Sequence, residues 1–154
     1  MSNSLRGMLA GLIATLVLSG ILIVKGNMDL WPELNIIRLL VSLGSIQTVA
    51  AWMDHFIVGV VVWGLLFSAF DTMWDSRAYW LKGLIFGVFA WFLMMVLFMP
   101  LAKAGYFGTR IGPTAIYVTL GMHLIYGLVL GISYGLLTAY YPAKTEKAPA
   151  PPHA

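Results

Sequence analysis

Four apolar stretches, each about as long as a helix that crosses the hydrocarbon core of a bilayer, dominate the sequence. Polar or helix-breaking residues separate them, and we place the stretches at about 6–24, 49–70, 79–99 and 115–140. Hydrophobic residues make up 60% of the chain and charged residues 10%, whereas soluble domains contain about 45–50% apolar and about 25% charged residues. The sequence therefore excludes a soluble globular domain and predicts an all-α membrane protein, a four-helix transmembrane bundle.

The connection between the first two stretches contains a short amphipathic segment. At about 32–43 apolar residues recur at helical spacing, but the run is too short to cross a bilayer and includes Glu33 and Arg38. It predicts an interfacial helix lying on the outer leaflet. Residues 142–154 are rich in proline and alanine and predict a disordered tail, so we assign the transmembrane domain to residues 1–141.

The first stretch and the basic residues bear on topology. Arg6 followed by an apolar run and Leu18-Ser19-Gly20 also fits a cleaved secretory signal, but the internal repeat described below favours a permanent helix. The basic residues give a five-to-four bias that predicts cytoplasmic termini. The side of the termini holds Arg6, Arg77, Lys82, Lys144 and Lys147, and the other side holds Lys25, Arg38, Lys103 and Arg110.

The two halves of the chain share a pattern. Arg6-Gly7-x3-Gly11-x2-Ala14 matches Lys82-Gly83-x3-Gly87-x2-Ala90, which lies 76 residues later. His55-x3-Gly59 likewise matches His123-x3-Gly127, which lies 68 residues later. Two spans separate each residue from its counterpart, so matched helices point the same way. The pattern predicts two related helix hairpins about a pseudo-two-fold axis along the membrane normal.

Glycines at small-xxx-small spacing allow the backbones of membrane helices to approach closely. This spacing is seen at Gly7, Gly11, Gly83, Gly87, Gly127, Gly131 and Gly135. Packing within the chain is the favoured interpretation. The stripe of three glycines in the fourth span is the best candidate for a face offered to a partner chain, because a single pair already suffices for one helix contact.

His55 and His123 are the most informative polar residues, because their matched positions predict similar depths and side chains that face each other. Two opposed imidazoles can ligate a b-type haem or, with methionine, copper. The methionines considered are Met53, Met94, Met95, Met99 and Met122. Proton handling is a third role. The favoured interpretation is a brace, in which each ring bonds a backbone carbonyl or a hydroxyl such as that of Thr48 or Thr119.

Other polar groups narrow the function further. The chain has no cysteine, which excludes disulfides, thiolate zinc sites, iron–sulfur clusters and a cysteine nucleophile. The basic residues are scattered rather than clustered, so nucleic acid is not a predicted partner. Asp71 and Asp75 have a spacing that suits a magnesium site, but without a phosphate-binding loop they indicate a charged connection. Asp54 is expected to pair with Arg38 or Arg110.

Four segments carry a resemblance to known proteins: Arg6–Thr15, Asp54–Gly59, Phe98–Gly108 and His123–Gly131. They resemble a family of uncharacterised bacterial four-span integral membrane proteins, and the chain is also similar to the YagU-like inner-membrane proteins. The resemblance covers most of the chain. It implies a multi-pass protein of the bacterial cytoplasmic membrane with a four-helix fold, and it carries no established activity.

The sequence predicts a non-enzymatic function. The first hypothesis is an accessory or structural subunit that packs into a larger membrane complex, or self-associates, through glycine-lined faces. The second is a haem- or copper-binding protein of electron transfer or cofactor handling, with His55 and His123 as ligands. The third is a small transporter or proton-handling protein, supported by the repeat and the intramembrane polar groups.

Overall fold

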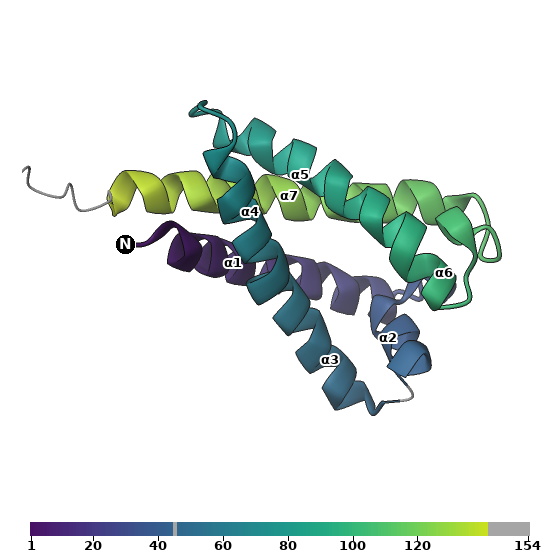
Figure 1. The fold of residues 1–154 in the computed structure, drawn as a ribbon. Helices are drawn as coiled ribbons and strands as arrows, with labels where there is room; N and C mark the ends of the chain where they lie inside the picture. Colours follow the sequence, from purple (N-terminus) through teal and green to yellow (C-terminus); the bar gives the residue numbers. More distant parts are fainter. Residues whose placement is uncertain (45, 142–154) are drawn as a thin grey trace, which may run out of the picture.

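The structure, a computed structural model, describes residues 1–44 and 46–141. Four of its helical segments are long and apolar enough to cross a membrane. The first is α1 (Asn3–Asn27) and the fourth is α7 (Thr114–Tyr140), and no strand occurs in the described ranges. The predicted all-α, four-span fold class is therefore confirmed (Figure 1). The disordered tail predicted for residues 142–154 lies outside the described residues.

The second and third spans each contain a π-helical piece. The second span runs through α3 (Thr48–Phe56), η2 (Ile57–Val62) and α4 (Trp63–Thr72). The third runs through α5 (Tyr79–Leu93), η3 (Met94–Phe98) and α6 (Met99–Leu101). At the end of η2 the N–H of Trp63 donates to the carbonyl of Val58, and at the end of η3 the N–H of Met99 donates to the carbonyl of Met94. Each donor lies five residues after its acceptor, which is the π-helical spacing. Such wide turns are frequent at functional sites.

The predicted interfacial helix is divided into two pieces, the 3-10 turn η1 (Pro32–Leu34) and α2 (Ile36–Gly44). Asn35 separates them, because its side-chain oxygen accepts hydrogen bonds from the N–H groups of Ile37 (3.0 Å) and Arg38 (3.2 Å) and so begins a new helix. A further 3-10 turn, η4 (Tyr106–Gly108), lies between α6 and α7.

Close backbone contacts between glycines hold together the two helix pairs, α1 with the second span and α5 with α7. A Cβ atom on Gly64 would lie 2.6 Å from the carbonyl oxygen of Gly7, and one on Gly11 would lie 2.8 Å from that of Gly59. In the other pair, a Cβ atom on Gly83 would overlap the carbonyl oxygen of Gly127. Only glycine permits this approach.

The three-glycine stripe of the fourth span faces α5 of the same chain. A Cβ atom on Gly127 would overlap the carbonyl oxygen of Gly83, and one on Gly131 would overlap that of Tyr79. A Cβ atom on Gly135 would lie 3.1 Å from the Cβ of Tyr79. This stripe, expected to be the best candidate for contact with a partner chain, is thus occupied by intramolecular packing.

The bundle is tightly packed near the termini and opens toward α2. On the side of the termini, Phe67 is fully buried and meets Phe86 and Tyr134 edge-on, with ring centroids 5.3 Å apart in each case. Toward the other end the second span leaves the bundle, and α3 lies beside α2 (Figure 1). A smaller cluster that includes Met95 and Met99 forms the core at that end.

Candidate functional site

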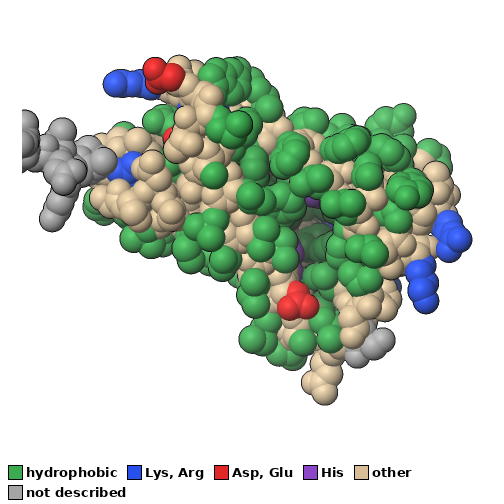
Figure 2. All heavy atoms as spheres, viewed as in Figure 1, with side chains coloured by type: hydrophobic (Ala, Val, Ile, Leu, Met, Phe, Trp, Pro, Cys, Tyr) green, Lys and Arg blue, Asp and Glu red, His purple; other side chains and the backbone are tan. Residues whose placement is uncertain are grey.

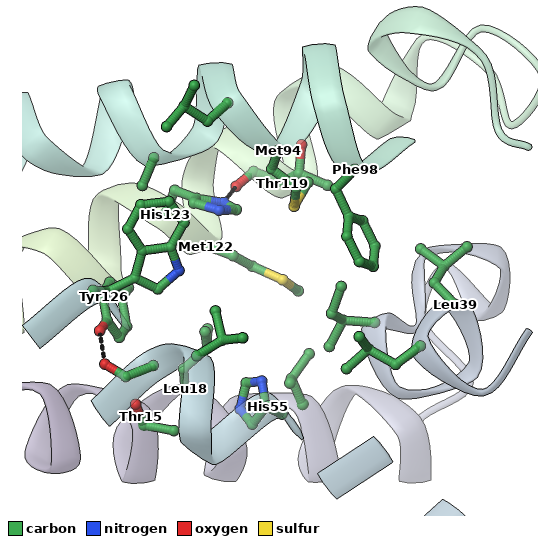
Figure 3. A pocket seen from close by; sticks show the side chains of 18 of the residues that line it. Thr15, Leu18, Leu39, His55, Met94, Phe98, Thr119, Met122, His123 and Tyr126 are labelled. Carbon is green, nitrogen blue, oxygen red and sulfur yellow. Dashed lines mark hydrogen bonds between the residues drawn. The ribbon is translucent and has the colours of Figure 1, made fainter. Parts of the chain in front are cut away.

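A cavity of about 340 Å³ lies where the two helix pairs diverge, between the two core clusters. All four spans and α2 contribute to its wall, which is mostly apolar (Figure 3). Its lining includes Thr15, Leu18, Asp54, His55, Gly59, Trp63, Met94, Phe98, Met99, Met122, His123 and Tyr126. Cavities of about 300–1,000 Å³ are typical of small-molecule sites.

The cavity opens on the flank of the bundle. Figure 2 shows a hollow between the second and third spans, with histidine side chains visible inside it and an acidic side chain at its rim. The surrounding surface consists largely of hydrophobic side chains. Since this surface belongs to helices long and apolar enough to cross a membrane, the opening would face lipid in a bilayer.

His123 lines the cavity from α7 and is bonded at one of its two ring nitrogens. Its Nδ1 lies 2.8 Å from the carbonyl oxygen of Thr119. A carbonyl can only accept, so Nδ1 carries the hydrogen, and in the neutral ring Nε2 is a hydrogen-bond acceptor. The Thr119 hydroxyl in turn accepts from the indole of Trp91 (3.0 Å) and donates to the carbonyl of Ala115. The bond to the Thr119 carbonyl fixes the orientation of the imidazole, and the separate bonds of the Thr119 hydroxyl join the third span to α7 beside it.

His55 lines the cavity from α3, on the opposite side of the space from His123 (Figure 3). Its Nε2 lies 3.2 Å from the hydroxyl of Ser19 on α1. The rings of Trp52 and Phe56 each stand edge-on to the imidazole, with centroids 5.7 Å away. Both histidines therefore bond a carbonyl or a hydroxyl, as a brace would, and both also border the same cavity.

The two histidines lie at different levels relative to the glycine contacts. Gly11 faces the carbonyl oxygen of Gly59, whereas Gly87 faces that of His123. Gly11 and Gly87 are matched positions in the two halves of the sequence. Because their packing partners are Gly59 and His123, His123 occupies the place in its helix pair that Gly59 occupies in the other. His55, four residues before Gly59, lies one helical turn, about 5 Å, closer to the α2 end. The two histidines, which occupy matched positions in the sequence and were expected at similar depths, therefore lie about one helical turn apart along the bundle.

Asp54 is the one acidic residue in the lining, and it is exposed. Neither expected arginine pairs with it: within residues 1–44 and 46–141 the ion pair found is that of Lys82 with Asp71 (2.6 Å). Arg110 donates instead to the backbone carbonyl of Lys103. Asp54 therefore lies at the mouth of the cavity without an ion-pair partner among the described residues.

The deep wall of the cavity carries polar groups that the sequence analysis did not single out. The Tyr126 hydroxyl donates to the carbonyl of Gly59 (2.6 Å), which joins α7 to the π-helical piece of the second span. A Cβ atom on Gly59 would overlap the hydroxyl of Thr15, which itself donates to the carbonyl of Gly11 (2.7 Å). The indole of Trp63 also lines this wall, and its N–H makes no hydrogen bond within the described part of the chain.

Three of the five methionines considered with the histidines, Met94, Met99 and Met122, line the cavity. In Figure 3 Met122 extends between the two histidines. Met53 is exposed, and Met95 is fully buried in the cluster beside the cavity. The fold therefore brings thioethers and imidazoles together, although no sequence spacing relates them.

The side chains in the lining that can ligate a metal are two imidazoles, three thioethers and the carboxylate of Asp54. Among the residues described, no three His, Cys, Asp or Glu side chains are grouped to hold a metal. The lining contains neither lysine nor arginine to pair with the carboxylates of a haem. At His55 the Nε2 atom is bonded to Ser19, so Nδ1 is the ring nitrogen left to contact a ligand.

Comparison with known proteins gives one match. A family model described as "Family of unknown function (DUF6789)" matches residues 1–144. This fits the expectation of an uncharacterised family. No curated protein and no solved structure matches the chain.

Proposed function

This chain belongs to the DUF6789 family, and we propose that it is a non-enzymatic membrane protein whose cavity binds a neutral, lipid-soluble small molecule. The observation that carries the proposal is the position of the cavity, between helices long and apolar enough to cross a membrane and open on the flank of the bundle (Figure 2). A molecule dissolved in the bilayer can enter such a site without crossing water.

The charge of the lining disfavours an anionic ligand. The wall holds one carboxylate, Asp54, and no lysine or arginine. An anionic lipid or fatty acid would lose its hydration without gaining a cation in exchange, which is costly in an apolar site. A neutral molecule with a few hydrogen-bonding atoms matches a lining that is mostly apolar with a few polar groups.

The cavity and the glycine contacts bear differently on the three hypotheses drawn from the sequence. The role of accessory subunit rested on the glycine stripe of the fourth span, which α5 covers. The cofactor hypothesis is retained in altered form, since His55 and His123 border the site but suit an organic ligand better than haem. The transport hypothesis gains a cavity that opens on the flank of the bundle.

The cellular setting is also part of the proposal. We place the protein in the bacterial cytoplasmic membrane with both termini in the cytoplasm. The support is the resemblance to bacterial four-span proteins and the five-to-four bias of basic residues toward the side of the termini.

A matched pair of variants on α1 tests the proposal. Leu18 lines the cavity and points into it (Figure 3), whereas Leu16 does not line it and is 54% exposed. Leu18→Trp should fill part of the cavity, and Leu16→Trp adds the same side chain on the lipid side. The probe is a neutral alkyl diazirine, photolysed with the protein in nanodiscs, and the labelled peptides are identified by mass spectrometry.

The expected result is saturable labelling of cavity residues such as Met94 and Met122 in the wild type and in Leu16→Trp. Leu18→Trp should reduce that labelling about tenfold while labelling of lipid-facing residues stays unchanged. Labelling that rises linearly with probe concentration at every site, and is equal in the two variants, would overturn the proposal.

A further inference from the structure

We propose that the ligand of this cavity is a hydroquinone, a flat aromatic ring that carries hydroxyl groups on a lipid-soluble body. This inference rests on the proposed function and names the chemical class that the site would select. It follows from three polar atoms in the wall whose hydrogen-bonding capacity the chain leaves open.

The first is Nε2 of His123. The bond from Nδ1 to the Thr119 carbonyl makes Nε2 an acceptor in the neutral ring. No carboxylate lies within ion-pair distance of this imidazole in the described ranges, and an unpaired charge in an apolar cavity is costly. Nε2 therefore calls for a ligand that donates a hydrogen bond, such as a hydroxyl.

The second is the indole N–H of Trp63, which can only donate. The Trp63 ring lies edge-on to Phe86, with centroids 5.9 Å apart, and Trp63 also lines the cavity. Its N–H is not one of the fully buried unpaired polar atoms of the described residues, so it is open to donate to a molecule in the cavity. A hydroxyl group donates one hydrogen bond and accepts others, so a ligand that carries hydroxyl groups can bond both the acceptor of His123 and the donor of Trp63.

The third is Nδ1 of His55, the ring nitrogen that does not contact Ser19. The two imidazoles come from different helix pairs and border the space from opposite sides (Figure 3). A ring with hydroxyls at opposite ends presents one to each imidazole, whereas an aliphatic alcohol with one hydroxyl satisfies one.

The rest of the lining suits an aromatic ring. Phe98 and Tyr126 supply aromatic faces or edges, and Met94 and Met122 supply polarizable thioethers. Aromatic pairs and sulfur–aromatic contacts favour a flat ring beyond the burial of its area. The polar atoms and the apolar wall together point to the same ligand.

The experiment compares three soluble short-chain probes with the wild-type protein in nanodiscs under anaerobic conditions, followed by tryptophan fluorescence. The probes are a prenylated hydroquinone, its dimethyl ether and the corresponding quinone. The ether and the quinone keep the ring but lack the hydrogen-bond donor. The hydroquinone should bind about tenfold more tightly than either, as expected for an acceptor left unpaired in an apolar site.

Two variants assign the preference to His123. His123→Leu removes the acceptor and should abolish the difference between hydroquinone and ether, whereas His123→Gln supplies an amide oxygen and should restore part of it. The comparison of probes on the wild type needs no variant, so the inference can be tested even if His123→Leu does not fold.

The outcomes separate the inference from the proposed function. If the three probes bind equally to the wild type, and Leu18→Trp weakens all of them, the cavity binds neutral molecules but the hydroquinone inference is wrong. If none binds, and Leu18→Trp labels like the wild type, the proposed function fails as well. Stoichiometric copper or a haem absorption band lost in His123→Leu would replace the hydroquinone with a metal or haem.

Discussion

Replacing Gly64 with alanine tests the contact that closes the pair formed by α1 and the second span. The added Cβ would lie 2.6 Å from the carbonyl oxygen of Gly7 and 3.0 Å from the Cα of Met8. Both neighbours are backbone atoms and cannot rotate away. Since unstrained contacts are about 3.5 Å, the helices must separate by roughly 1 Å, which forfeits a quarter to a half of the local dispersion energy.

The expected free-energy change combines two opposing effects. Overpacking against rigid neighbours costs about 2–3 kcal/mol, and replacing glycine by alanine inside a helix returns about 1 kcal/mol. Gly64→Ala should therefore lower the free energy of unfolding by about 1–2 kcal/mol. The control is Gly121→Ala on α7, where no atom lies within 4 Å of the added Cβ, so stability should be unchanged or rise by up to about 1 kcal/mol.

The assay is equilibrium unfolding in mixed micelles, followed by tryptophan fluorescence, on the wild type and both variants. The predicted order of stability is Gly121→Ala at or above the wild type, with Gly64→Ala below it. Equal stability of the two variants would refute the conclusion that the close approach of these backbones holds the pair together.

Two further stability predictions use the same assay. Tyr126→Phe leaves the carbonyl of Gly59 without its donor and should cost about 1–3 kcal/mol; no change would mean that this bond does not join the helix pairs. Lys82→Met should cost about 3–5 kcal/mol, because it leaves Asp71 largely buried without its partner. Adding Asp71→Leu should recover much of that loss, and two additive losses would contradict the pairing.

The sequence predicted four long apolar helices correctly, because the length of an apolar run and the turn residues that end it are both visible in the sequence. The interfacial segment was located but not its division, since Asn35 acts as a cap only once the chain turns there. The π-helical pieces have no signal in the apolar runs that contain them. They arise where the spans pack around the cavity.

The candidate site was predicted only in part. His55 and His123 stood out as intramembrane polar residues, but the partner of each ring, Ser19 and the Thr119 carbonyl, depends on which helices meet. The spacing of glycines is the same whether a stripe packs inside the chain or against a partner, so the role of the fourth-span stripe could not be read from it. Trp63 resembles any core or lipid-facing aromatic residue in the sequence.

Native mass spectrometry of the protein released from its membrane, with Leu18→Trp and Leu16→Trp beside it, tests the central claim most directly. The account predicts a neutral, lipid-soluble molecule bound near one per chain in the wild type and in Leu16→Trp, and lost from Leu18→Trp, whose added side chain fills the cavity. The claim would be contradicted if the wild type carried only bulk membrane lipid and Leu18→Trp carried the same amount of that lipid.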